Sequence, residues 1–125
     1  MGMAEDLDTG ALLARTYSLP NRQRVRLRLV RRSDLPGLAD LLAQRDIEPS
    51  PLELERLVRY DPRRRLVLCA TAPIGGTEAV VGVGAIELRA PLAEPDTVVV
   101  DERLTDGLPQ LLQSALVGRA ARRVA

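Results

Sequence analysis

Two apolar runs that flank a pair of adjacent glycines constrain the fold of this chain more than any other feature. Residues 66–72 form the first run and residues 80–88 form the second, with Gly75 and Gly76 in the turn between them. Glycine supplies the backbone conformations that tight turns between strands require. Apolar runs of this length, bounded by turn residues, are typical of strands. The pattern therefore predicts an antiparallel hairpin.

The remaining segments show the periodicities of one strand, two helices, a short strand and a final helix. Apolar residues and arginines alternate from Arg24 to Leu29, which predicts a strand with one buried face. Leucines recur at helical spacing after Ser33 or Asp34, either of which can cap a helix that ends near Gln44. The other predicted elements are a helix over 52–58, a strand over 97–100 and a helix with an apolar stripe from 108 to 120.

This order, β-α-α-β-β-β-α, predicts a mixed α/β (α+β) fold in which helices cover the faces of a mostly antiparallel sheet of about four strands. Residues 1–21 are interpreted as an amino-terminal arm with a possible helix around Leu12 and Leu13, and residues 22–125 as one domain. Aromatic residues make up only 2% of the chain, so Leu, Val, Ile and Ala have to form the core. Such a modest core favours association with another subunit.

Residue usage excludes several kinds of chemistry. The sequence has no histidine, which rules out Ser-His and Cys-His nucleophilic pairs and histidine-ligated zinc. Cys69 is the single cysteine and lies in an apolar run, so we interpret it as a buried thiol and expect no metal site. The net charge of +1 gives no strong positive field that would attract nucleic acid or an anionic membrane. No apolar segment is long enough to span a membrane, and the acidic amino terminus is unlike the basic start of a signal peptide. We therefore expect a cytoplasmic protein.

Three segments resemble the GNAT (N-acetyltransferase) superfamily, from about Val25 to the end of the chain. VRLRLVRRSDLPGLADLL is similar to the family's first strand and to the R-x-S/T-D-x-x-x-L start of its helix. RLVLCATAPIGGTEAVVGVGAIEL resembles the family's central hairpin, and VVVDERLTDGLPQLLQSAL resembles its fourth strand, cofactor loop and following helix. The resemblance implies a GNAT-like fold, acetyl-CoA or coenzyme A as cofactor, and acetyl transfer to an amine. It covers the first two thirds of that fold, so the later strands are expected to be missing.

The resemblance also implies that the coenzyme A pyrophosphate binds where the final helix begins. In the family this loop has the form Gln/Arg-x-x-Gly-x-Gly/Ala, and its backbone N–H groups point at the phosphates. The cofactor would then contact the backbone of Val99, Val100, Asp101, Gly107 and Leu108.

This sequence departs from the family's loop pattern. Gly107 matches, but Leu104 and Pro109 stand at the other two positions, and Pro109 has no N–H to donate. Asp106 adds a carboxylate that would cap the helix and repel a phosphate. We therefore expect an eroded acetyl-CoA site.

The candidate general base is Glu87 in the third strand, because GNAT enzymes often use a carboxylate to deprotonate the amine. Asp101 and Glu102 are alternative candidates for the base. The competing, purely structural interpretation is that Glu87 lies on the solvated face of the hairpin strand. Neither Tyr17 nor Tyr60 matches the tyrosine that often serves the family as general acid. We interpret Tyr60 as a half-buried packing residue.

The apolar strand over residues 98–100 would be left with an uncovered edge, so we expect a homodimer or a partner protein there. Two functional hypotheses follow. One is an interaction or regulatory module with weak or no acetyl-CoA chemistry, and the other is an active N-acetyltransferase whose cleft is completed by a dimer mate. Nucleic-acid binding through Arg22–Arg32 and Arg63–Arg65 is a third, less favoured because stacking aromatic residues are lacking.

Overall fold

The structure is a computed structural model that describes residues 16–88 and 94–124. Its elements are β1 (Thr16–Ser18), β2 (Arg24–Leu29), the 3-10 helix η1 (Arg32–Asp34), α2 (Leu35–Gln44), α3 (Pro51–Val58), β3 (Arg65–Ile74), β4 (Thr77–Glu87), β5 (Thr97–Val100), the 3-10 helix η2 (Glu102–Leu104) and α4 (Leu108–Val124). The strands form one antiparallel sheet in the order β1-β2-β3-β4-β5. The fold is thus the mixed α+β architecture that the sequence predicts.

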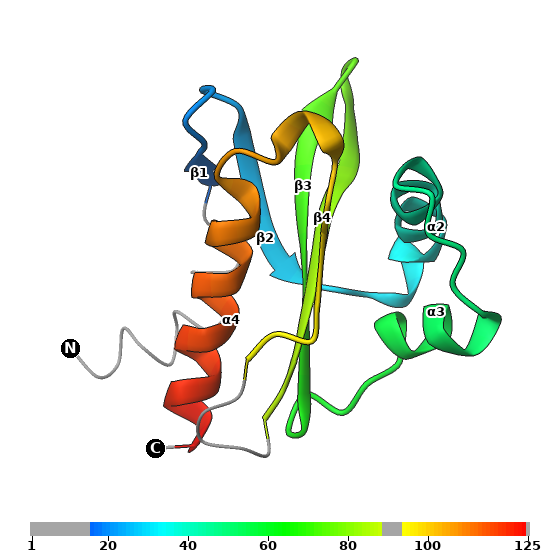
Figure 1. Ribbon diagram of the computed structural model, residues 1–125, viewed down its shortest axis with the longest axis vertical. Helices are drawn as coiled ribbons and strands as arrows, with labels where there is room; N and C mark the ends of the chain where they lie inside the picture. Colours follow the sequence, from blue (N-terminus) through cyan, green and yellow to red (C-terminus); the bar gives the residue numbers. More distant parts are fainter. Residues whose placement is uncertain (1–15, 89–93, 125) are drawn as a thin grey trace.

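The sheet separates two helical layers (Figure 1). α4 covers one face, and α2 and α3 lie on the other. The core beneath α4 includes Leu108, Leu112 and Leu116, all 0% exposed. The core beneath α2 and α3 includes Leu38 and Leu42. Because both faces of the sheet are covered, β3 and β4 are nearly continuous apolar runs instead of alternating ones.

The structure corrects the predicted number of strands from about four to five. Residues 16–18 form the short strand β1, which pairs with β2 in the register Tyr17↔Val25. Three residues are too few to show a strand period, so the sequence pattern did not indicate this strand. The possible helix around Leu12 and Leu13 lies outside the described residues.

The helix starts show how local sequence determines the elements. Ser50 caps α3, because its hydroxyl oxygen accepts a hydrogen bond from the backbone N–H of Glu53 at 3.1 Å. Asp34 stands at the matching position of α2 but makes no side-chain cap bond to that helix. Its carboxylate instead accepts hydrogen bonds from Arg28 and from the backbone N–H of Arg31.

Two glycines of β4 let α4 pack directly against the sheet. A Cβ atom at Gly84 would lie 2.8 Å from Cδ1 of Leu116, and one at Gly82 would lie 3.1 Å from the side chains of Leu108 and Leu112. The leucines of α4 therefore occupy the space that side chains of β4 would fill. Gly82 also pairs with Val100, so the first turn of α4 lies beside the end of β5.

Candidate functional site

The outer edge of β5 is open within the described part of the chain. β5 pairs with β4 in the register Val100↔Gly82, and no described strand pairs with its other side. Asp101 donates its backbone N–H to the carbonyl oxygen of Val81 at 2.8 Å. Because backbone groups alternate along a strand, the N–H of Val100 then faces the open edge. This edge can pair with an extended ligand or with another strand.

Asp101 follows β5 and anchors the turn toward α4. Its carboxylate accepts hydrogen bonds from the backbone N–H of Arg103 at 2.8 Å and from the Arg103 guanidinium at 2.8 and 2.9 Å. Gln44 of α2 donates another at 3.3 Å. The Arg103 side chain lowers the pKa of Asp101 to about 2. At neutral pH, Asp101 is therefore ionised and its oxygens already accept hydrogen bonds from Arg103 and Gln44, which makes it a poor general base.

Gly107 immediately precedes α4, and both its backbone conformation and its packing require a glycine at this position. Its φ of 102° lies in the left-handed region that favours glycine. A Cβ atom at this position would lie 2.6 Å from Cδ of Pro20. The glycine that matches the family's loop pattern therefore also has a structural reason to be present.

The first turn of α4 offers few backbone donors to an anion. The N–H of Gly107 donates to Oε1 of Gln110 at 3.1 Å. The first helical residues are Leu108, Pro109 and Gln110, whose N–H groups have no partner within the helix, and Pro109 has none to offer. No described residue donates a hydrogen bond to the side chain of Asp106, which is exposed, so Gln110 supplies the cap that we expected from Asp106. Two N–H groups, those of Leu108 and Gln110, remain.

A cleft of about 370 Å³ opens at the amino end of β5, on the face that α2 and α3 cover. Its floor and walls are formed by Arg65, Glu87, Asp96, Thr97 and Val99 of the sheet region and by Leu42, Ile47, Pro49, Glu53, Arg56 and Leu57 of the helical region. The lining is partly apolar and carries both signs of charge. The turn before α4 lies at the other end of β5, and four strand residues span about 13 Å.

Arg65 connects three segments at the floor of the cleft. Its Nη1 atom lies 3.1 Å from Oε1 of Glu87 and 2.7 Å from Oδ2 of Asp96, and its Nη2 atom lies 2.9 Å from Oδ1 of Asp96. The Arg65 side chain is 14% exposed, whereas that of Glu87 is 44% exposed. Hydrogen bonds from Arg65 hold the pKa of Asp96 below its ordinary value. Glu87 therefore borders both the cleft and solvent, as one partner of an ion pair.

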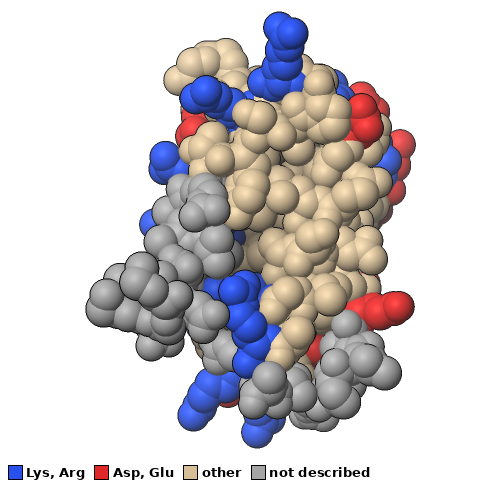
Figure 2. Space-filling model, turned by 90° about the vertical axis from the view of Figure 1, so that its left-hand side faces the viewer, with Lys and Arg blue, Asp and Glu red and all other residues tan. Residues whose placement is uncertain are grey.

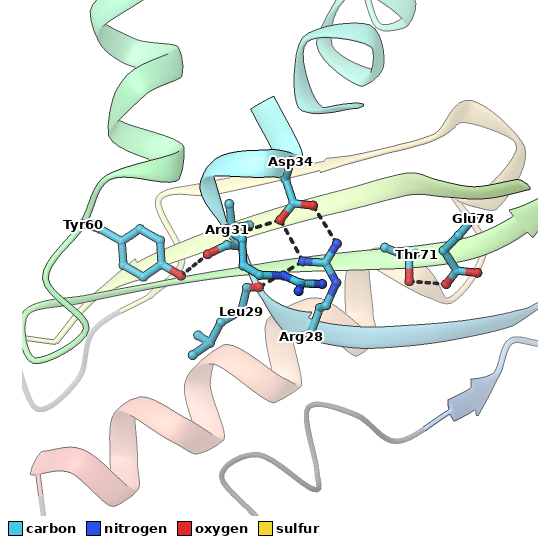
Figure 3. Close-up of polar contacts among 8 residues, drawn as sticks. Arg28, Leu29, Arg31, Asp34, Tyr60, Thr71 and Glu78 are labelled. Carbon is cyan, nitrogen blue, oxygen red and sulfur yellow. Dashed lines mark hydrogen bonds and ion pairs between the residues drawn. The ribbon is translucent and has the colours of Figure 1, made fainter. Parts of the chain in front are cut away.

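A second polar cluster lies where β2 leads into α2 (Figure 3). The Asp34 side chain is 6% exposed, and its oxygens lie 2.6 and 2.7 Å from the two terminal nitrogens of Arg28. The backbone N–H of Arg31 donates to the same carboxylate at 2.6 Å. Burial alone would raise the pKa of Asp34, but the hydrogen bonds from Arg28 and Arg31 outweigh burial and lower it. The pair ties the end of β2 to the start of α2.

Tyr60 and Cys69 have the structural roles that the sequence predicts. Tyr60 is partly buried, and its hydroxyl donates to the carbonyl oxygen of Val30 at 2.8 Å (Figure 3). Burial raises the pKa of Tyr60 to about 12. Cys69 is 0% exposed, and burial raises the pKa of its thiol to about 12 as well. Both groups are protonated at neutral pH, and neither lines the cleft.

The structure places the predicted site residues in three segments, namely the end of β4, β5 itself and the turn that leads into α4. Glu87 and Val99 line the cleft at one end of the strand. Gly107 and Leu108 lie at the turn near its other end, and the Leu108 side chain is fully buried, which leaves only its backbone for a ligand. Glu102, the other candidate base, is 64% exposed and lies outside the cleft lining.

Sequence reasoning missed Arg65 and Asp96 as residues of the cleft. Arg65 pairs directly with Glu87, but the register of the hairpin shifts by one residue near Ala70, so a regular register counted from the Gly75–Gly76 turn would have paired Arg65 with Ile86 instead. Asp96 carries no sequence signal either, because it lies in the connection before β5. Within residues 16–88 and 94–124, no group of carboxylates and thiols is arranged to hold a metal ion, and no helix is long and apolar enough to cross a membrane.

Comparison with known proteins places this architecture among solved structures. No protein-family model and no curated protein matches the sequence. The GNAT domain of S. lividans PAT superposes with a TM-score of 0.70 and 18% identity, covering 90% of this chain and 73% of that chain. A cAMP-binding acyltransferase from Mycobacterium smegmatis superposes with a TM-score of 0.58 and 18% identity, covering 98% of this chain and 42% of that chain. With the element order described above, these likenesses show that the chain has a GNAT-like fold.

Proposed function

We propose that this protein has a GNAT-like fold with an eroded acetyl-CoA site, and that it works as an interaction or regulatory module with weak or no acetyl transfer. The first turn of α4 carries this proposal. Binding of a pyrophosphate at a helix start relies on several backbone N–H groups that converge on the anion. Here Pro109 has no N–H, and that of Gly107 is taken by Gln110. The exposed carboxylate of Asp106 also opposes an anion at this position.

Calorimetric titration of coenzyme A into the wild type and into a variant with a repaired turn tests the proposal. Pro109→Ala restores one backbone donor, and Gln110→Ala releases the N–H of Gly107. We expect no saturable binding by the wild type and measurable binding by the double variant, because each hydrogen bond to a charged group contributes about 1.5–3 kcal/mol.

The matched control for this repair is Gln113→Ala, which changes an exposed glutamine one turn further along α4. It should leave coenzyme A binding as in the wild type. Tight binding by the wild type would contradict the proposal. A double variant that is folded and still does not bind would show that the erosion does not lie in this turn.

The open edge of β5 supports the interaction role. Val98 is 36% exposed, and the alternation of backbone groups places the N–H groups of Val98 and Val100 on the side that no described strand covers. An extended segment of a partner protein can pair with such an edge. In amide hydrogen exchange of the purified protein, Val98 and Val100 should exchange quickly and Val99 slowly. Protection of all three amides would show that the edge is already covered.

N-acetyltransfer is the second candidate function, and the cleft beside Glu87 favours it. An acetyl-CoA lying along the open edge of β5 would extend from the turn before α4 to the cleft. There the amine nitrogen would attack the thioester carbonyl carbon, its proton would pass to Glu87, and coenzyme A would leave as the thiolate. In this candidate, a dimer mate completes the cleft.

Release of free thiol from acetyl-CoA with a panel of amines distinguishes the two candidates. The module proposal predicts little or no release above the uncatalysed rate. If release is seen and Glu87 is the base, Glu87→Gln should lower kcat/KM by about 10²- to 10⁴-fold. Glu102→Gln is the matched control, because Glu102 is an exposed carboxylate outside the cleft lining. Release that depends on Glu87 and not on Glu102 would overturn the module proposal.

A further inference from the structure

The two segments that border the open edge of β5 are acidic. Residues 46–55 lead from α2 into α3 and contain no basic residue, although the whole chain has 18. Their acidic residues are Asp46, Glu48, Glu53 and Glu55. Residues 94–102 include β5 and also lack a basic residue. Their acidic residues are Glu94, Asp96, Asp101 and Glu102. The acidic groups are not spread evenly over the surface, because the centre of the α4 face shows none (Figure 2).

Part of this negative charge is not offset by arginine. Asp46, Glu48 and Glu94 are exposed, and no described residue forms an ion pair with any of them. The charges of Asp96 and Asp101, in contrast, are offset by neighbouring arginines. Unpaired exposed carboxylates at both borders create a local potential that attracts positive charge.

The acidic loop and β5 face each other across the cleft. Ile47 of the loop lines the cleft together with Thr97 and Val99 of β5. Just before the loop, Gln44 donates a hydrogen bond to Asp101 at the end of β5 at 3.3 Å. The loop therefore borders β5 on the face of the sheet that α2 and α3 cover.

An extended segment paired with the open edge would send alternate side chains to the two faces of the sheet. Residues opposite Thr97 and Val99 would point into the cleft, and a residue opposite Val98 would point to the α4 face. Val98 is 36% exposed, which suits an apolar neighbour. On the cleft side, Ile47 is 39% exposed, and no described residue donates a hydrogen bond to Oε2 of Glu87. A long basic side chain fits there, because its stem can lie on Ile47 while its charged end reaches the carboxylates.

We propose that the open edge of β5 binds an extended basic segment of a partner protein, in which arginine or lysine alternates with apolar residues. This inference rests on the proposed role as an interaction module and names the chemistry of the partner. Backbone hydrogen bonds to the N–H groups of Val98 and Val100 provide affinity, and the alternate side chains provide specificity. The same negative potential disfavours coenzyme A and nucleic acid at this edge, because both carry phosphates.

Charge also argues against two other occupants of this edge. Residues 1–15 contain Glu5, Asp6 and Asp8 but only Arg15 as a basic residue, so this segment has the same sign of charge as the borders of β5. A second copy that paired β5 with β5 would bring two sets of acidic borders together, and like charges repel. A basic partner protein is therefore favoured over the chain's own amino-terminal segment and over a homodimer.

Fluorescence polarisation tests the proposal with a labelled peptide in which Arg and Val alternate and which is long enough to span the four residues of β5. Arginine is chosen because its guanidinium stays protonated and is not an acceptor for amine acetylation. The wild type should bind this peptide saturably, and raising the salt from about 20 mM to about 0.5 M should weaken binding. A peptide with Glu in place of Arg should not bind. A peptide with Pro in place of Val should not bind either, because Pro cannot donate a backbone hydrogen bond.

Amide hydrogen exchange locates the bound peptide. The peptide should slow the exchange of Val98 and Val100, whose N–H groups face the open edge, and leave Val99 unchanged. Binding without protection of Val98 and Val100 would overturn the proposed pairing with β5.

A pair of double variants tests the role of the acidic loop. Asp46→Asn with Glu48→Gln removes two charges, and asparagine tolerates the φ of 58° at position 46. This variant should bind the Arg-Val peptide about five- to tenfold more weakly, because each exposed ion pair contributes up to about fivefold in affinity. The matched control is Asp40→Asn with Glu78→Gln, which also removes two exposed charges but lines a different hollow, beside Arg28. The control should bind like the wild type.

The outcomes separate this inference from the proposed function. Equal weakening by the two double variants would overturn the inference, because only the overall charge would then matter. A wild type that binds neither the peptide nor coenzyme A would also overturn it, and would leave the proposed erosion of the acetyl-CoA site untouched. Tight binding of coenzyme A by the wild type would instead contradict the proposed function itself.

Discussion

Asp34 is a buried carboxylate whose charge depends on its neighbours. A buried carboxylate is stable only when it is paired and hydrogen-bonded, and the two-pronged contact with Arg28 together with the N–H of Arg31 meets that need. The Arg28 side chain is 24% exposed, so the pair lies at the border of the core. It fixes the angle at which the chain leaves β2 and enters α2, the helix that forms one wall of the cleft.

Asp34→Asn should lower the free energy of unfolding at neutral pH by about 3 kcal/mol, because Arg28 is left without its counter-ion. The folded-state pKa of Asp34 is lowered, so its carboxylate adds stability above its unfolded pKa of about 3.9. That stability is lost as the pH falls through the folded-state pKa. Urea unfolding at pH 7 and in acidic steps should therefore show a difference between wild type and variant that shrinks in acid.

Asp40→Asn is the control for this titration, because Asp40 is exposed on the same helix. Its effect on stability should stay within about 0.5 kcal/mol at every pH. If the difference between Asp34→Asn and the wild type were the same at acidic and neutral pH, the ionised pair could not be its cause.

Gly107 shows that a residue can match a cofactor motif and still be needed for folding. Gly107→Ala should lower the free energy of unfolding by about 2 kcal/mol, because it combines a left-handed backbone with a clash against Pro20. Gly118→Ala, in open space within α4, should instead stabilise the protein by up to about 1 kcal/mol. Thermal unfolding of both variants measures the contrast. Equal effects of the two substitutions would argue against strain at Gly107.

At the scale of elements, the sequence indicates most helices and strands because their periodicities are local. The hairpin follows from two apolar runs around Gly75 and Gly76, and α3 follows from the spacing of its leucines. Contacts that depend on register are harder to predict. The ion pair between Arg65 and Glu87 requires the pairing of β3 with β4, which contains an irregularity near Ala70.

The packing of α4 on β4 also could not be predicted from either element alone. Gly84→Val should lower the free energy of unfolding by about 1–3 kcal/mol, because the new side chain would collide with Leu116. Combining it with Leu116→Ala should relieve the collision, so that the double variant is more stable than the sum of the single effects predicts. Chemical denaturation of the four proteins gives the coupling. Strictly additive effects would show that α4 does not approach β4 at this glycine.

At the scale of the whole molecule, the fold and the cofactor site depend on different residues. Leu108, Leu112 and Leu116 attach α4 to the sheet, and all three are fully buried. Asp106 and Pro109 belong to the same segment but have little part in that core. The GNAT-like architecture can therefore persist even if the turn has lost donors for a pyrophosphate, as we propose. This separation explains why the fold could be predicted with more detail than the activity.

The melting temperature of the purified protein with and without millimolar acetyl-CoA tests the proposed erosion of the acetyl-CoA site most directly. A ligand at 100 times its Kd stabilises the native state by about 2.7 kcal/mol, which corresponds to a shift of roughly 10 °C for a domain of this size. The proposed erosion of the turn before α4 predicts a shift below about 1 °C. A shift of roughly 10 °C in the wild type would contradict it, because the protein would then bind acetyl-CoA despite Pro109 and the occupied N–H of Gly107.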